Sequence, residues 1–179
     1  MKRVVSLFAA VFTTAVMSAS VAEAQSPIRF GIAGGLSLPT GEDKDFVETG
    51  FHGQVMLGFG MIALPVKLRA DLSYHSFGGK ENPFFDEVDY RIISGALNAI
   101  VGMGGIGVKP YFTGGLGVYN FKAEVDGEDF TETKLGLNGG IGLEFSLTGM
   151  STFLEARYVH IFTEEEATQI IPITFGILF

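Results

Sequence analysis

From Ile28 onward, apolar side chains recur at every second position, which is the period of a β-strand with two unlike faces. Glycine interrupts almost every segment, and no apolar stripe of helical spacing lasts two turns. The alternation predicts eight strands. They are Ile28–Pro39, Gly50–Met61, Val66–Phe77, Tyr90–Val101, Val108–Phe121, Thr133–Leu147, Ser151–Phe162 and Ile170–Phe179. Their average length slightly exceeds the ~9–11 residues that a tilted strand needs to cross a bilayer.

The two faces of these segments differ in polarity. In the third segment Leu68 and Leu72 share one face, while Arg69 and Asp71 lie on the other. A soluble barrel or sandwich places its apolar face inward, whereas a transmembrane barrel turns that face to lipid and keeps a polar interior. The alternation is compatible with both arrangements, so the distribution of charge has to decide between them.

The connections between the segments alternate between short and long. The short ones are Ile62–Pro65, Gly102–Gly107 and Thr148–Met150, and the long ones are Thr40–Thr49, Gly78–Asp89, Lys122–Glu132 and Thr163–Gln169. Of the nineteen acidic residues after position 24, sixteen lie in the long connections, whereas most basic residues lie on the polar strand face. Short periplasmic turns and longer outer loops are typical of outer-membrane barrels. The sequence therefore predicts an all-β, eight-stranded antiparallel transmembrane β-barrel with acidic outer loops.

Composition excludes several other classes of protein. Disorder is excluded because 47% of the 179 residues are hydrophobic and 17 are Phe. The absence of Cys excludes disulfide scaffolds and thiolate metal sites. A net charge of −8 argues against a nucleic-acid partner, since such partners need clustered Lys and Arg.

The N-terminal residues have the pattern of an export signal. Lys2 and Arg3 precede the apolar run Val4–Val16, and Ala22-Glu23-Ala24 forms an A-x-A cleavage site. We therefore expect residues 1–24 to be a signal peptide and residues 25–179 to be the barrel domain.

With a signal peptide, eight alternating strands and a terminal Phe179, the chain resembles the small outer-membrane β-barrel family, in particular porin-like proteins of the OmpA-transmembrane-domain and OmpX type. The most specific element is the last strand, with Ile171, Ile173, Phe175, Ile177 and Phe179 in one apolar row. The resemblance implies that this strand, with Phe175, Ile177 and Phe179, is the signal read by the barrel-assembly machinery. It also implies the outer membrane of a Gram-negative type of bacterium as the location.

Eight strands enclose an interior that side chains just fill. We expect a salt-bridged plug of inward polar residues: Arg29, Gln54, Lys67, Arg69, Asp71, Asn98, Lys134, Glu144, Glu155 and Arg157. The alternative is a narrow or gated pore. With six basic and three acidic residues on the inner face, such a pore would favour anions.

No catalytic, metal or cofactor site is predicted. His52 and His75 fall on the polar face and His160 near the outer rim, and none is followed two residues later by a serine, the spacing expected of outer-membrane lipid A deacylases. The acidic runs Asp126-Gly127-Glu128-Asp129 and Glu164-Glu165-Glu166 lack the spacing of a calcium loop, so we interpret them as solvated loops.

Three functions remain open from the sequence. The first is a structural or surface-interacting protein that acts through its acidic outer loops. The second is a low-conductance porin for small solutes, and the third is a soluble periplasmic carrier of lipocalin type. For the first two we expect a monomer whose partners are outer-membrane lipid, lipopolysaccharide and, during insertion, the barrel-assembly machinery.

Overall fold

The computed structural model describes residues 28–41, 44, 47–60, 66–78, 90–103, 107–125, 128–147, 149–163 and 167–179, with side chains left out at 123–130. The expected signal peptide at residues 1–24 lies outside the described residues. Within them, no helix has the length and apolarity needed to cross a bilayer.

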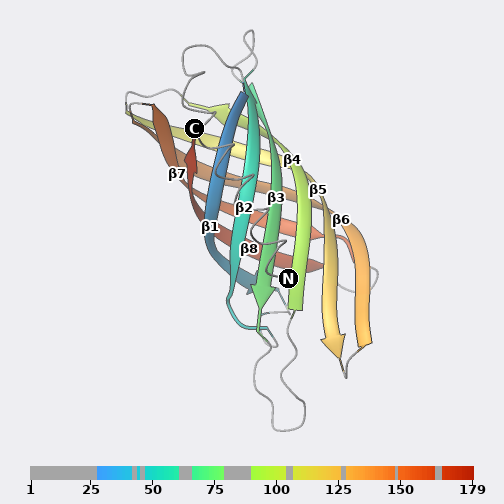
Figure 1. The fold of residues 1–179 in the computed structure, drawn as a ribbon. Helices are drawn as coiled ribbons and strands as arrows, with labels where there is room; N and C mark the ends of the chain where they lie inside the picture. The colour runs from blue at the N-terminus through green and yellow to red at the C-terminus, as the bar shows by residue number, and fades with distance from the viewer. Residues whose placement is uncertain are drawn as a thin grey trace, which may run out of the picture.

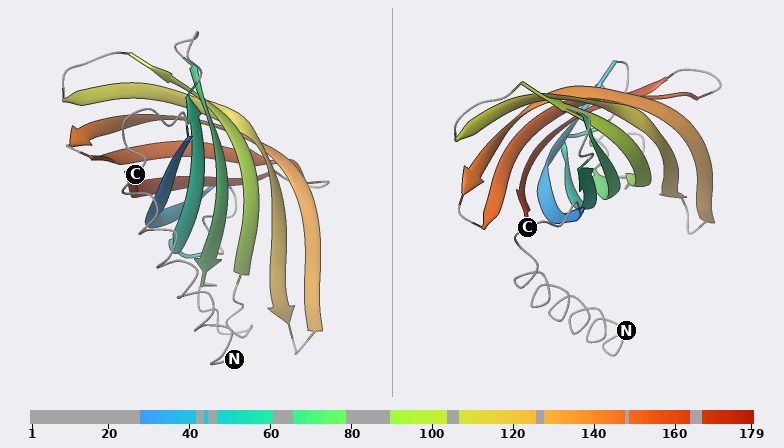
Figure 2. Two further views of the ribbon diagram at one scale, coloured as in Figure 1. Left: turned by 45° about the horizontal axis from the view of Figure 1, so that its top comes forward. Right: turned by 90° about the horizontal axis from the view of Figure 1, so that it is seen from above.

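The described residues form eight antiparallel strands that close into one barrel. The strands are β1 (Ile28–Thr40), β2 (Gly50–Gly60), β3 (Val66–Phe77), β4 (Tyr90–Gly102), β5 (Val108–Val125), β6 (Glu128–Leu147), β7 (Met150–Ile161) and β8 (Thr168–Leu178). Each strand pairs with its sequence neighbours, and β1 also pairs with β8, from Gly31↔Leu178 to Thr40↔Gln169. Figures 1 and 2 show the tilted strands curving around a common interior. The predicted fold class is confirmed.

The prediction for the connection between β5 and β6 is wrong. The sequence places a long loop at 122–132, but β5 runs to Val125 and β6 starts at Glu128, so the two strands form one long hairpin. Their pairing extends from Val108↔Phe145 to Val125↔Glu128. By contrast, β7 pairs with β6 only as far as Gly136↔Ile161. Figure 1 shows β5 and β6 projecting past their neighbours. The cause is cross-strand pairing, which adds main-chain hydrogen bonds where high charge suggests a loop.

The other strand boundaries differ from the prediction by at most two residues at each end, and β3 agrees at both ends. β6 ends at Leu147 and β7 begins at Met150, so the connection between them is short. Gly149 has a φ of 83° there, a conformation that costs glycine little because it has no Cβ.

We expect heat-modifiable migration on gels, because a closed barrel offers denaturant no free strand edge to open. Electrophoresis of boiled and unboiled samples in dodecyl sulfate checks this. Identical mobility of the two samples would contradict closure of β1 onto β8.

Candidate functional site: the charged interior of the barrel

The ten polar residues predicted to face inward lie on the inner side of the barrel wall. Seven of them are buried: Gln54, Arg69, Asp71, Asn98, Glu144, Glu155 and Arg157. The other three, Arg29, Lys67 and Lys134, are partly exposed and lie toward the two ends of the barrel. Lys134 forms an ion pair with Glu132 at the long-loop end.

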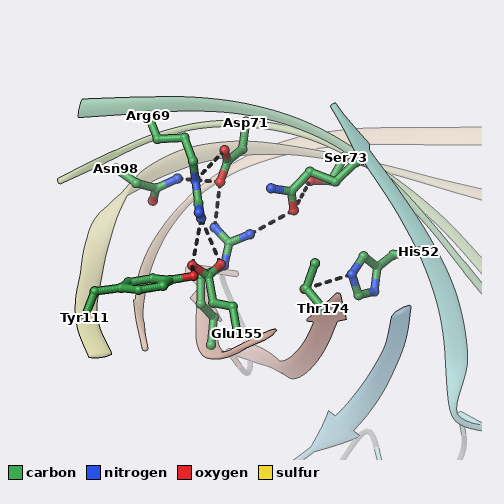
Figure 3. Close-up of polar contacts among 10 residues, drawn as sticks. His52, Arg69, Asp71, Ser73, Asn98, Tyr111, Glu155 and Thr174 are labelled. Atoms are coloured by element: carbon green, nitrogen blue, oxygen red, sulfur yellow. Dashed lines mark hydrogen bonds and ion pairs between the residues drawn. The ribbon is translucent and has the colours of Figure 1, made fainter. Parts of the chain in front are cut away.

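At the centre, two arginines and two carboxylates from opposite walls form a four-charge cluster, which we call the plug: Arg69 and Asp71 of β3 with Glu155 and Arg157 of β7. Arg69 Nη2 donates to Glu155 Oε1 at 2.8 Å, and its Nε lies 2.9 Å from Asp71 Oδ1. Arg157 Nη1 donates to Asp71 Oδ2 at 3.0 Å, and its Nε lies 2.9 Å from Glu155 Oε1. Each arginine therefore contacts both carboxylates, and the four formal charges sum to zero (Figure 3).

Neutral side chains add hydrogen bonds to the plug. Asn98 Nδ2 donates to Asp71 Oδ2, and Tyr111 Oη donates to Glu155 Oε2, each at 2.8 Å. Arg157 Nη2 donates to Gln54 Oε1 at 2.9 Å. A buried ion pair is tolerated when further hydrogen bonds satisfy its remaining donors and lone pairs. These partners come from β2, β4 and β5, so the plug and its partners tie together five strands.

Beside the plug, toward the long-loop end, two histidines share one serine. Ser37 Oγ lies 3.0 Å from His52 Nδ1 and 2.8 Å from His75 Nδ1. His52 Nε2 lies 3.0 Å from Thr174 Oγ1 (Figure 3), and the two imidazole centroids are 5.2 Å apart. Ser37 is 0% exposed, so this cluster cross-links β1, β2, β3 and β8 inside the barrel.

The third histidine, His160, lies on the outer face of β7, where its ring contacts those of Tyr158 and Phe162. Across the described part of the chain, no three His, Asp or Glu side chains come together as a metal-binding group.

Between the histidines and the long connections, apolar side chains pack together inside the barrel. We call this cluster the apolar cap. Its buried members are Phe77, Ile92, Tyr119, Val159, Ile161 and Ile170, with Val47 and Phe121 packed against them. The ring of Tyr119 lies where side chains at Gly117 and Gly136 would stand, since a Cβ at Gly136 would come 2.8 Å from Tyr119 Cε2. Glycine on the inner face thus makes room for the aromatic residues that fill the barrel.

A smaller apolar layer, Met56, Tyr111 and Phe153, lies on the short-turn side of the plug. Beyond it is the short-turn mouth, where Glu144 joins two cations. Arg29 Nη1 donates to Glu144 Oε1 at 3.1 Å, and Lys67 Nζ donates to Glu144 Oε2 at 3.5 Å. Arg29 Nη2 also donates to Ser151 Oγ at 2.8 Å.

The outer wall is apolar where the inner wall is polar. Strands β3, β4, β5, β6 and β8 each carry a large apolar side chain that is more than half exposed: Leu72, Leu97, Leu116, Ile141 and Phe175, respectively. A soluble carrier with an apolar interior would have the opposite arrangement, so that hypothesis is excluded. The fold and its charged interior define a transmembrane β-barrel of the outer-membrane kind.

The chain belongs to the family described as the outer membrane protein beta-barrel domain, whose family model matches residues 7–176. It is accordingly an outer-membrane protein of the Gram-negative type of envelope. No curated protein sequence matches the chain.

Solved structures agree on the fold. Neisserial surface protein A is 17% identical, with a TM-score of 0.65 over 86% of this chain and 96% of that one. The N-terminal β-barrel domain of Pseudomonas aeruginosa OprF is 20% identical, with a TM-score of 0.52 over 84% and 97%. Ail of Yersinia pestis, the attachment invasion locus protein in complex with the heparin analogue sucrose octasulfate, is 14% identical, with a TM-score of 0.53 over 86% and 100%.

The structure adds to the interior further residues that were not predicted as site residues, among them Ser37, Tyr111, Tyr119 and Thr174. A signal was present, because all four share the inward parity of their strands. Charged and amide groups on that face mark the predicted site residues, whereas the hydroxyl and phenol groups that serve as their partners carry no comparable signal in the sequence.

Proposed function

We propose that this protein is a closed, non-conducting outer-membrane barrel that acts through its outer surface. The observation that carries the proposal is the filled interior. Along the barrel axis an apolar cap, a histidine–serine cluster, a neutral plug and a second apolar layer follow one another. An ion crossing this path would have to displace buried ion pairs and then leave water to pass the cap, which is costly.

The outer loops are the surface that remains for interaction. The outer loops and the projecting β5–β6 hairpin together carry sixteen acidic residues, which favour a partner of basic character, since charge complementarity speeds association and selects partners. Neisserial surface protein A and the attachment invasion locus protein are named for roles at the cell surface, which agrees with the proposal. We further propose a monomer surrounded by outer-membrane lipid and lipopolysaccharide and inserted by the barrel-assembly machinery.

We also propose that the protein has no enzymatic activity. Ser37 and His52 are hydrogen-bonded as a nucleophile and a base would be, but both are buried beneath the apolar cap, out of reach of a substrate. His160 contacts two aromatic rings on the outer face.

Planar-bilayer recording of the refolded protein tests the closed interior. We expect no discrete current steps above the detergent-only control. Steps with anion selectivity would contradict the proposal and would favour the small-solute porin suggested by the basic excess of the inner face. The variant Asp71→Asn removes one carboxylate from the plug and so weakens its ion pairs. Current steps from this variant, recorded in the same way, would show that the assay can detect a barrel whose plug has opened.

A further inference from the structure

The short-turn mouth contains a cavity of ≈ 130 Å³ that no part of the plug fills. Its charged lining is Arg29, Lys67, Arg69 and Glu144, and its apolar lining includes Ile100, Phe153 and Leu178. An engineered cavity of roughly 150 Å³ holds one benzene ring, so this space suits a ligand of about that size. The mouth opens on the side of the short turns, which in outer-membrane barrels is the periplasmic side.

The mouth carries more positive than negative charge. Arg29 and Lys67 share the one carboxylate of Glu144, and Lys109 is the cross-strand partner of Glu144. The Lys67 side chain is 50% exposed, and among the described residues its ammonium has one ionic contact, the 3.5 Å contact to Glu144. The short connections 61–65, 103–107 and 148–149 contain no Asp or Glu that could supply a second carboxylate. A cation pair with one shared carboxylate has spare donors for an incoming anion.

The wall of the cavity limits what that anion can be. Farther into the barrel than the cations, the apolar wall includes Ile100, Phe153 and Leu178, which pack around the apolar layer of Met56 and Tyr111. Arg69, which also borders the cavity, is already bound to Asp71 and Glu155. A fully hydrated ion such as phosphate would leave this wall in contact with water, whereas an apolar group would cover it.

We propose that the short-turn mouth binds an amphiphilic anion: an acidic head group held by Lys67 and Arg29, with a single ring or a short alkyl chain against Ile100, Phe153 and Leu178. Two sources share this chemistry, a small free carboxylate of the periplasm and an acidic lipid of the inner leaflet. This inference is independent of the closed interior, because the cavity borders the plug only at Arg69, and filling it leaves the ion pairs of Arg69 with Asp71 and Glu155 in place.

Methyl NMR in nanodiscs of zwitterionic lipid, with benzoate as the probe, tests the proposal. We expect saturable shifts of the Ile100 and Leu178 methyl groups, and much smaller shifts with benzyl alcohol, the uncharged analogue. Lys67→Gln should weaken benzoate binding about tenfold, the factor that corresponds to ~1.4 kcal/mol for one lost charge-assisted contact. The matched control Lys122→Gln, on the outer face near the other end of the barrel, should leave it unchanged.

Glu144→Gln separates binding from mere disruption of the mouth. Because Glu144 competes with the ligand for Arg29 and Lys67, its neutralisation should strengthen benzoate binding, whereas structural damage would weaken it. Nanodiscs that contain phosphatidylglycerol distinguish the two sources: shifts at Ile100 without benzoate, and loss of benzoate binding, assign the site to lipid. The proposal is overturned if benzoate gives no saturable shift, if benzyl alcohol or inorganic phosphate binds as tightly, or if Lys67→Gln has no effect.

Discussion

Replacing Glu155 with glutamine is expected to lower the free energy of unfolding by about 3–5 kcal/mol, the cost of breaking a buried ion pair by removing one partner. Glu155 receives donors from Arg69, Arg157 and Tyr111, and it is 1% exposed. Its neutralisation leaves two buried guanidinium groups with only Asp71 as a counter-charge. Reversible urea unfolding in lipid vesicles measures the change.

Two companion variants make this prediction specific. Glu144→Gln removes a carboxylate from the more accessible mouth and should cost about 1 kcal/mol or less, as expected for solvent-screened pairs. The double variant Glu155→Gln with Arg157→Met restores zero net charge to the plug and should be more stable than Glu155→Gln alone, so it remains informative if the single variant does not fold. A cost for Glu155→Gln as small as that for Glu144→Gln would show that the plug is screened by water.

An arginine at Ile141 is expected to destabilise the barrel by roughly 2–4 kcal/mol, because it places a charge in the hydrocarbon midplane. Ile141 is 61% exposed on the outer wall, and it lies near the middle of the β6 segment that pairs with β7. Unfolding titrations in vesicles give the value.

Leu135→Arg is the matched control on the same strand and the same face. Leu135 is 65% exposed but lies at the rim, where Phe162 N donates to its carbonyl oxygen at the end of β7. Six residues of tilted strand place it roughly 15 Å from Ile141 along the membrane normal, near the interface, so its arginine should cost about 0–1 kcal/mol. A cysteine-linked fluorophore at position 141 should be quenched from the lipid phase. Equal costs at the two positions, or a probe shielded from the quencher, would contradict the assignment of this face to lipid.

The sequence alone predicts the positions of the strands, because the period-two alternation is continuous through each of them. It fails between β5 and β6, where charged residues near Lys122 and Glu132 resemble a loop. The alternation in fact continues through Phe121, Ala123 and Val125, but the density of charge around these residues outweighs it, so the sequence suggests a loop where main-chain pairing continues to Val125 and Glu128.

The alternation along each strand also indicates which side chains point into the interior, but it does not indicate which of these side chains contact one another. Arg69 and Glu155 come from β3 and β7, on opposite walls, and their contact depends on the stagger accumulated around the barrel. A shift of two residues in one strand pair would preserve every inward residue and still separate these charges. The plug and the serine shared by His52 and His75 therefore required the closed structure.

The pairing of β1 with β8 has a consequence for how the chain enters the bilayer. Gly31 and Leu178, which pair in this ladder, lie almost the whole described chain apart. Contacts of such large sequence separation form slowly, so we expect the pairing of β1 with β8 to form last. Until it forms, an inserted sheet has two bare edges, and each unpaired N–H or C=O in hydrocarbon costs several kcal/mol. A partly inserted intermediate is therefore strongly disfavoured, and crossing of the membrane is expected to be concerted with closure rather than strand by strand.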